Sequence, residues 1–305
     1  MDAELFKPFK TVFWVLKPLG LWQDGNQSWT YFILGYAFHL IFYELYSLAF
    51  FIRGMEATNA QDIIDSAGLF SLKLAESFKA INFFIGLRRI KKLFGTLTRL
   101  LEFSADDRWK NRDQLKQEIN FALKIYKIMW ISAFVTCSTA VFVPVLTHKL
   151  PYKMYMPFNI LDTDIGFWFF SFLMIATSFP LSLIGVALDM LAPFFIAFAV
   201  GLVKELECRL NEINSGSLEN DEEFKTELVK CIEIHKKIKN FTTEIEKSFS
   251  KVFSIQGCLS SIILCASAFT LSTVRKLKFE LNSSANSNYS LRFKKLQKFL
   301  KLSRL

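Results

Sequence analysis

Signatures of enzymes and metal sites are missing from this 305-residue sequence, which holds only 12 glycines, 5 cysteines and 3 histidines. It has no glycine-rich phosphate loop, no HExxH and no GxSxG, so no residue is predicted to be catalytic and we do not expect an enzyme. The cysteines form no CxxC pair, and His39, His148 and His235 are too scattered for metal-ligand spacing. We therefore expect no metal and no other cofactor, and we interpret the cysteines as packing residues.

Proline is also scarce, with 7 residues, whereas there are 34 phenylalanines and 52% of the chain is hydrophobic. The apolar residues form long runs, and about 20 residues of helix cross a bilayer. Because backbone groups in hydrocarbon must pair within the chain, such runs are helices. We predict an all-α integral membrane protein, a helical bundle with about five transmembrane helices and long cytoplasmic helix extensions. The predicted spans are residues 31–52, 67–87, 128–146, 165–203 and 252–271.

The fourth predicted span has two possible arrangements. Its 39 residues contain one charge, Asp189, with Pro180 and Pro193 on either side, so it forms either one long tilted helix or a hairpin of two spans. Only 14 residues lie between Asp189 and Lys204, which is short for a crossing. We favour one helix that extends into the cytoplasm.

The loops differ in basic residues, which are retained on the cytoplasmic side of a membrane. The N-terminal arm up to Ser28 and the segments 86–124 and 202–250 hold 3, 10 and 8 Lys and Arg. The alternate loops, 53–65 and 147–165, hold 1 and 2. This distribution predicts a cytoplasmic N-terminus. It also explains the net charge of +9 without a nucleic-acid partner, so the expected partner is the lipid bilayer.

A long amphipathic helix is predicted from Asp221 to Phe249, because apolar residues recur there at spacings of three and four. No glycine or proline interrupts the chain before Gly257, so this helix should continue into the fifth span as one rod. Its apolar seam either packs against a neighbouring helix or forms a subunit interface. The candidate interface residues are Phe224, Leu228, His235, Ile238, Ile245 and Phe249.

Ionisable residues inside predicted spans are energetically costly and often functional. Glu44 lies in the first span and Asp189 in the fourth, and each lies near a helix end, pairs with a neighbour, or takes part in gating or in an ion path. The second span carries Lys73, Glu76 and Lys79 at three-residue spacing. This spacing places opposite charges one turn apart on the same helix face, where they can pair.

Three segments of the sequence form recognisable motifs. The N-terminal arm ends in FWVLKPLGLW, residues 13–22, and a later loop contains Leu150-Pro151-Tyr152 followed by Pro157. The most specific segment leads into the fifth span. It comprises Cys231-Ile232-Glu233-Ile234-His235-Lys236-Lys237-Ile238, Phe241, Glu244-Ile245-Glu246, Phe249-Ser250 and Leu264-Cys265. Over residues 5–271 the chain resembles the insect odorant receptor family.

The resemblance implies seven helices with a cytoplasmic N-terminus, in a tetrameric, odorant-gated, non-selective cation channel that includes a co-receptor subunit. It implies a multi-pass protein of the plasma membrane in sensory-neuron dendrites. The alternative to an odorant receptor is a gustatory-type chemoreceptor. The odorant, a small volatile molecule, would bind in an apolar pocket in the outer half of the subunit. Predicted depth and this analogy give the ligand-binding candidates Phe70, Leu74, Thr139, Phe142, Val143, Phe170, Met174 and Thr177.

The sequence departs from the family pattern after Leu271. Residues 272–305 form a basic C-terminal tail with nine Lys and Arg and one acid, Glu280, where the family continues with a sixth and a seventh helix. We therefore divide the chain into an odorant-receptor-like transmembrane domain, residues 1–271, and this off-family tail. We expect a receptor truncated after its fifth helix. The alternative function is a non-conducting membrane subunit that assembles with intact ones.

Overall fold

The computed structural model describes residues 5–17, 20–22, 29–103, 113–148, 155, 163–215 and 221–302. All regular secondary structure in these ranges is helical, as the sequence predicts. The helices are α1 (Lys7–Leu16), α2 (Trp29–His39), the π-helix η1 (Leu40–Leu45), α3 (Tyr46–Glu56), α4 (Ala60–Phe103), α5 (Asp113–Leu146), α6 (Asp164–Asn214) and α7 (Asp221–Leu302).

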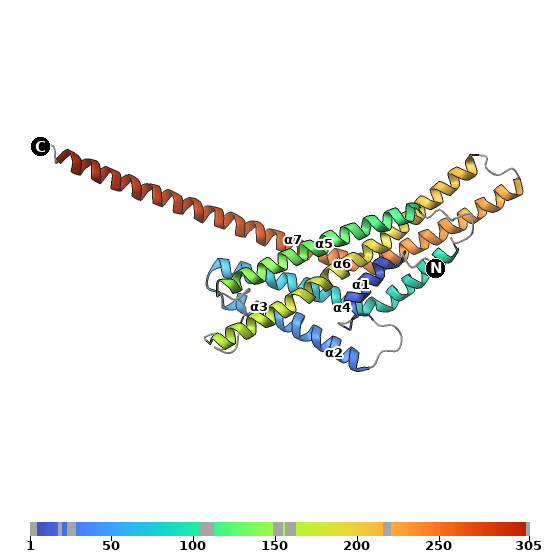
Figure 1. Ribbon diagram of the computed structural model, residues 1–305, viewed down its shortest axis with the longest axis horizontal. Coiled ribbons are helices and arrows are strands. Elements are labelled where there is room, and N and C mark those ends of the chain that lie inside the picture. Colours follow the sequence, from blue (N-terminus) through green and yellow to red (C-terminus); the bar gives the residue numbers. More distant parts are fainter. Residues whose placement is uncertain are drawn as a thin grey trace.

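Helices α4 to α7 form an elongated bundle, and α7 continues beyond it as a long projecting helix (Figure 1). The central helix is α6, because 61% of its most apolar 18-residue stretch is buried, against 17% for the corresponding stretch of α5. It packs against α5, α7 and the short α1, while α4 packs against α3 and α7 and also contacts α6. All the other long helices therefore contact α6, and its residues influence how they are arranged.

Three helices of the described chain are long and apolar enough to cross a membrane, namely α5, α6 and α7. The first predicted span, 31–52, is divided among α2, η1 and α3. The second, 67–87, lies within α4 and contains the three charges that the sequence places there. These three helices contain the third, fourth and fifth predicted spans, whereas the first and second crossings stay predictions.

The two longest helices answer questions that the sequence left open. The fourth predicted span is a single helix, because the 51 residues of α6 continue through Pro180 and Pro193. The predicted rod is confirmed, since α7 joins the amphipathic segment to the fifth span in one helix of 82 residues. Local chemistry stabilises the N-terminus of each of these two helices. The Thr163 side chain caps α6 by accepting a hydrogen bond of 3.1 Å from the Gly166 N–H, and α7 begins with three acidic residues at the positive end of its dipole.

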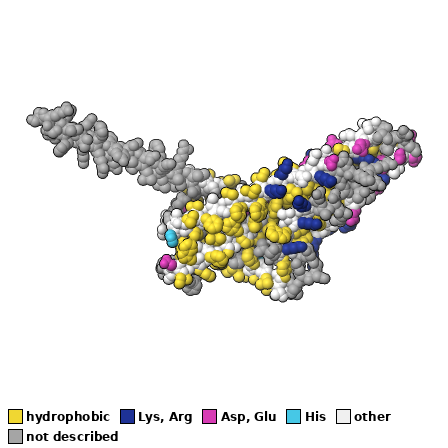
Figure 2. Space-filling view, viewed as in Figure 1, with side chains coloured by type: hydrophobic (Ala, Val, Ile, Leu, Met, Phe, Trp, Pro, Cys, Tyr) yellow, Lys and Arg dark blue, Asp and Glu magenta, His cyan; other side chains and the backbone are white. Residues whose placement is uncertain are grey.

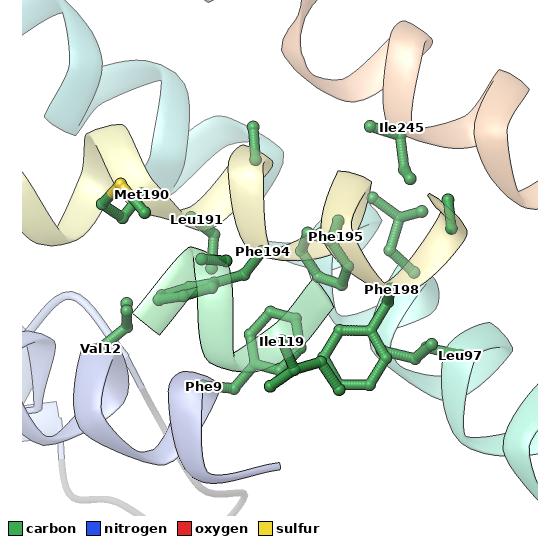
Figure 3. Packing of buried hydrophobic residues seen from close by; sticks show 14 of the residues in the cluster. Phe9, Val12, Leu97, Ile119, Met190, Leu191, Phe194, Phe195, Phe198 and Ile245 are labelled. Atoms are coloured by element: carbon green, nitrogen blue, oxygen red, sulfur yellow. The ribbon is translucent and has the colours of Figure 1, made fainter. Parts of the chain in front are cut away.

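A phenylalanine-rich core lies between α1 and α6 (Figure 3). The amphipathic α1 buries Phe9 and Val12 completely. The centroid of the Phe9 ring lies 4.7 Å from those of Phe94 and Phe195 and 5.4 Å from that of Phe198. Because removal of one such buried ring costs about 3–5 kcal/mol, this contact holds α1 firmly in the bundle.

Apolar side chains cover a broad zone of the surface, and Lys and Arg gather beside it, at the level of the bundle where α1 lies (Figure 2). Large apolar residues also face outward on α5 and α6, among them Ile131, Ile165 and Phe172. A continuous exposed apolar surface of this kind is unfavourable in water and suits contact with lipid. The surface is therefore that of a membrane protein.

Candidate functional site

Two groups of polar side chains lie between helices inside the predicted spans. The first is built around Lys79 of α4, which is only 7% exposed. Its ammonium nitrogen lies 2.9 Å from Glu76 Oε1, one turn earlier in α4, and 2.9 Å from Asp189 Oδ1 of α6. The predicted pairing of Glu76 with Lys79 is confirmed. Asp189 also pairs, with a residue 110 positions away that spacing alone does not identify.

The Glu76 carboxylate fits against α6 because Gly185 has no side chain. A Cβ atom at that position would lie 2.7 Å from Glu76 Oε2, closer than van der Waals contact allows. This oxygen is buried and has no hydrogen-bond partner in the part of the chain that the structure describes. Lys73 is close enough to interact with Glu76 electrostatically. Two basic and two acidic side chains thus balance each other's charge here.

Helix α7 joins the group through Gln256, whose Nε2 donates a hydrogen bond of 3.2 Å to Asp189 Oδ1. A cavity of about 40 Å³ lies beside these contacts, between α4, α6 and α7. Its wall combines apolar side chains from all three helices with the polar side chains of Lys79, Asn82, Asp189, Ser248 and Gln256. We call Glu76, Lys79, Asp189 and Gln256 the three-helix polar cluster.

The second polar group joins the π-helix to α4. Glu44 lies in η1, and its carboxylate accepts a hydrogen bond from the buried hydroxyl of Ser77. Single π-helical turns inside helical segments frequently occur at functional sites. Glu44 and Asp189 therefore both pair with neighbours, which is one of the alternatives that the sequence left open for them. Their role in gating stays a hypothesis.

The eight predicted ligand-binding residues differ in burial. Met174 and Thr177 of α6 are 0% and 4% exposed, and Tyr46 of α3 approaches the Thr177 hydroxyl. Thr177 Oγ1 donates a hydrogen bond of 2.8 Å to the Leu173 carbonyl. Phe70 and Phe170 are half-buried, whereas Leu74, Thr139, Phe142 and Val143 are exposed.

These eight residues do not surround one of the cavities described. None of them lines the cavity beside the three-helix polar cluster, or a larger one of about 370 Å³ between α6 and α7. Predicted depth selects a level in the membrane but not a side of the helix, and Thr139 and Val143 lie on the exposed side of α5. Sequence reasoning also missed Tyr46, whose signal was a hydroxyl-bearing ring in the outer half of the first predicted span.

The six candidate interface residues of α7 also fall into different environments. Ile238, Ile245 and Phe249 are buried in the core of this chain, and the Phe249 ring lies 6.1 Å from the Phe195 ring between centroids. Figure 3 shows Ile245 directed towards the core residues of α6. This part of the seam therefore packs within the chain. Phe224 and His235 are exposed, and Leu228 is half-buried.

An ion pair outside the predicted spans joins the far ends of α6 and α7. The Arg209 guanidinium donates to the Glu227 carboxylate at 2.7 Å, and the two side chains are 11% and 6% exposed. Burial by itself would raise the pKa of Glu227, but hydrogen bonds from Arg209 and Lys230 bring it below its ordinary value. The carboxylate is therefore held in its ionised form, and the contact ties the two helices together.

A sequence model of the 7tm odorant receptor family matches residues 59–282, more than two thirds of the chain. The chain belongs to the odorant receptor family. The resemblance carried by the motifs is thereby confirmed. This odorant receptor is a membrane receptor of olfaction, which is a class of receptor and not of enzyme.

Solved structures of the insect olfactory receptor OR5 from Machilis hrabei share the fold of this odorant receptor. One matches with a TM-score of 0.66 and 17% sequence identity, covering 88% of this chain and 72% of that chain. The other, in complex with eugenol, matches with a TM-score of 0.68 and 15% identity, covering 88% and 71%. At these identities the likeness establishes the arrangement of the helices.

Proposed function

We propose that this odorant receptor binds small volatile odorants and acts in the plasma membrane as one subunit of a tetrameric, non-selective cation channel with a co-receptor. The family match supports the receptor role, and the likeness to OR5 in complex with eugenol supports a small aromatic ligand. A cytoplasmic N-terminus is supported by the position of α1 at the level of the bundle where Lys and Arg gather (Figure 2).

The observation that carries the odorant site is the buried pair of Met174 and Thr177 in α6. Because Thr177 donates its own proton to the Leu173 carbonyl, the lone pairs of its oxygen can accept a hydrogen bond from a ligand hydroxyl. Met174 offers an adaptable, polarisable wall, and Phe70 and Phe170 offer aromatic surface. A weakly polar molecule with one hydroxyl group suits such a site. Leu74, Thr139, Phe142 and Val143 complete the proposed set.

The exposed residues of the α7 seam are the proposed contact with the co-receptor. Phe224 is 41% exposed on the stretch of α7 that precedes the predicted span, and therefore lies outside the predicted membrane layer. His235 is exposed farther along the same helix. Because Ile238, Ile245 and Phe249 are already buried within the chain, a partner subunit would contact the part of α7 that Phe224 and His235 occupy.

Thr177→Val tests the odorant site, because valine keeps the shape of the side chain and removes its oxygen. The receptor is expressed with a co-receptor, and currents are recorded over a concentration series of eugenol and of a hydrocarbon odorant of similar size. Loss of a hydrogen bond of about 1 kcal/mol should raise the half-maximal concentration of eugenol about fivefold and leave that of the hydrocarbon unchanged. Thr98→Val is the control, because it removes a hydroxyl that bonds in the same way to the Phe94 carbonyl of α4.

The outcomes separate the two parts of the proposal. Equal responses of the wild type and Thr177→Val to eugenol would contradict the site. If the receptor reaches the cell surface and no odorant evokes a current, the channel function is wrong and a non-conducting subunit is favoured. Surface biotinylation of the same cells gives the delivery control.

A further inference from the structure

The three-helix polar cluster lies at a turn of α6 with weakened backbone hydrogen bonding. Pro193 has no N–H group, so the carbonyl of Asp189, four residues earlier, lacks its usual helical donor. Helices kink at proline for this reason. The side chain of the same Asp189 is held by Lys79 at 2.9 Å and by Gln256 at 3.2 Å. Side chains therefore tie this turn to both α4 and α7.

Stability alone does not account for the cluster. Apolar residues of similar size would hold three helices together at least as well as a buried ion pair, because burial removes water from both charges. Ionisable groups within membrane spans are rare and mark functional positions, and Lys79 and Asp189 both lie in predicted spans. An ion pair differs from apolar packing because it has two distinct states. The relative position of the helices decides whether Lys79 and Asp189 are in contact or separated.

The broken state also has a place for the separated charges. The cavity of about 40 Å³ borders Lys79, Asp189 and Gln256 and has room for water. Asn82 and Ser248 add polar atoms to its wall, so water would find hydrogen-bond partners there. When Lys79 and Asp189 move apart, this water can solvate them. The ion pair can therefore break without leaving Lys79 and Asp189 buried as unsolvated charges.

We propose that Lys79, Asp189 and Gln256 form a clasp that holds α4 and α7 against the proline-weakened turn of α6, and that its opening transmits odorant binding to the inner half of the bundle. Thr177 and Asp189 are 12 residues apart, which is about 18 Å along α6. A ligand that shifts the outer half of α6 therefore acts on the clasp through one continuous helix. The link to odorants rests on the proposed function, whereas the clasp itself is a property of the helices.

Gln256→Met tests the clasp in the working channel, because it removes the bond from α7 to Asp189 and leaves Lys79 and Asp189 paired. A hydrogen bond to a charged group is among the stronger ones, so we expect the half-maximal odorant concentration to fall about tenfold and the odorant-independent current to rise. The control is Lys92→Met. It breaks the exposed Lys92–Glu244 pair, which joins α4 to α7 at 3.3 Å, and should change neither quantity. Equal behaviour of the two variants would overturn the role of the clasp in gating.

Thiol labelling tests the clasp without any current. Ser248 lines the cavity, and Ser250 is exposed two residues later on α7, so a cysteine at each position reports on the cavity and on the outer surface. The receptor is purified in lipid nanodiscs after its three exposed cysteines are replaced by alanine. Gln256→Met should raise the maleimide labelling rate about tenfold in Ser248→Cys and not in Ser250→Cys.

The labelling result also separates the two proposals. An unchanged rate in Ser248→Cys would overturn the clasp, whatever the currents show. If the rate rises while the wild type gives no odorant-evoked current, the clasp stands and the proposed channel function fails.

Discussion

Replacing Gly201 with alanine should destabilise this odorant receptor, although it adds a single methyl group. A Cβ atom at Gly201 would lie 2.6 Å from Leu115 Cδ1 and 2.9 Å from Leu115 Cα. The Leu115 side chain can rotate away, but its Cα moves only with the whole of α5. The variant therefore forces α5 and α6 apart at a contact where a small residue lets two backbones approach closely.

The size of this effect can be compared with that expected at two other glycines. Overpacking costs about 1–3 kcal/mol, whereas alanine gains about 1 kcal/mol over glycine in helix propensity. Because the clash at Gly201 involves backbone, the upper end of that range applies, and the net loss should be about 2 kcal/mol. Gly95 has no atom within 4 Å of its Cβ position, so Gly95→Ala should keep the gain alone. Gly185→Ala should be intermediate, because it meets the movable end of Glu76.

The assay is thermal unfolding of the purified receptor in lipid nanodiscs, with all variants scanned at one rate because unfolding of such proteins is under kinetic control. A loss of about 2 kcal/mol should lower the midpoint by several degrees. The expected order of midpoints is Gly95→Ala, wild type, Gly185→Ala and Gly201→Ala, from highest to lowest. If Gly201→Ala melts at or above the wild type, α5 and α6 do not approach at this glycine and the reasoning is refuted.

Two further predictions concern α1 and the ion pair that joins α6 to α7. Phe9→Ala removes a fully buried ring and should cost about 3–5 kcal/mol, so limited proteolysis within α1 should accelerate, whereas Trp14→Ala, at a side chain 75% exposed, should leave it unchanged. The lowered pKa of Glu227 means that its pairing with Arg209 stabilises the fold fully above the ordinary value of 4.5 and loses this effect as the pH falls below it. Glu227→Gln should therefore lower the midpoint at pH 7 and flatten its decline in acid; an unchanged pH profile would contradict this.

Composition and loop charge predict much of the fold, because each has one dominant physical cause. A hairpin at the fourth span would carry the basic segment 202–250 across the membrane, so the sequence favours one helix, and α6 has that form. The continuity of α7 follows from the lack of helix breakers before Gly257. Both features depend on the local sequence and on the membrane, and not on which helix lies beside which.

Contacts between helices are harder to predict, because they depend on how each helix is rotated about its axis. Periodicity pairs Glu76 with Lys79 on one helix, but the choice of Asp189 as second partner is fixed by the rotation of α6. Rotation also buries Thr177 and exposes Thr139. The apolar seam of α7 has the same limit, since its spacing shows that one face is covered and not whether this chain or another covers it.

The central helix carries residues that lower its own stability, and this explains how its neighbours are placed. Gly185, Asp189, Pro193 and Gly201 lie within 17 positions of α6, the most buried of the three helices that are long and apolar enough to cross a membrane. Glycine and proline weaken a helix, and an acidic side chain in a membrane requires a partner. The close approach of α4 at Gly185 and of α5 at Gly201, and the bonds from α4 and α7 to Asp189, offset these costs. Contacts with neighbouring helices, and not intrinsic helicity, therefore determine how α6 is placed in the bundle, and substitutions at these positions should move α4, α5 and α7 more than they change the helical content of α6.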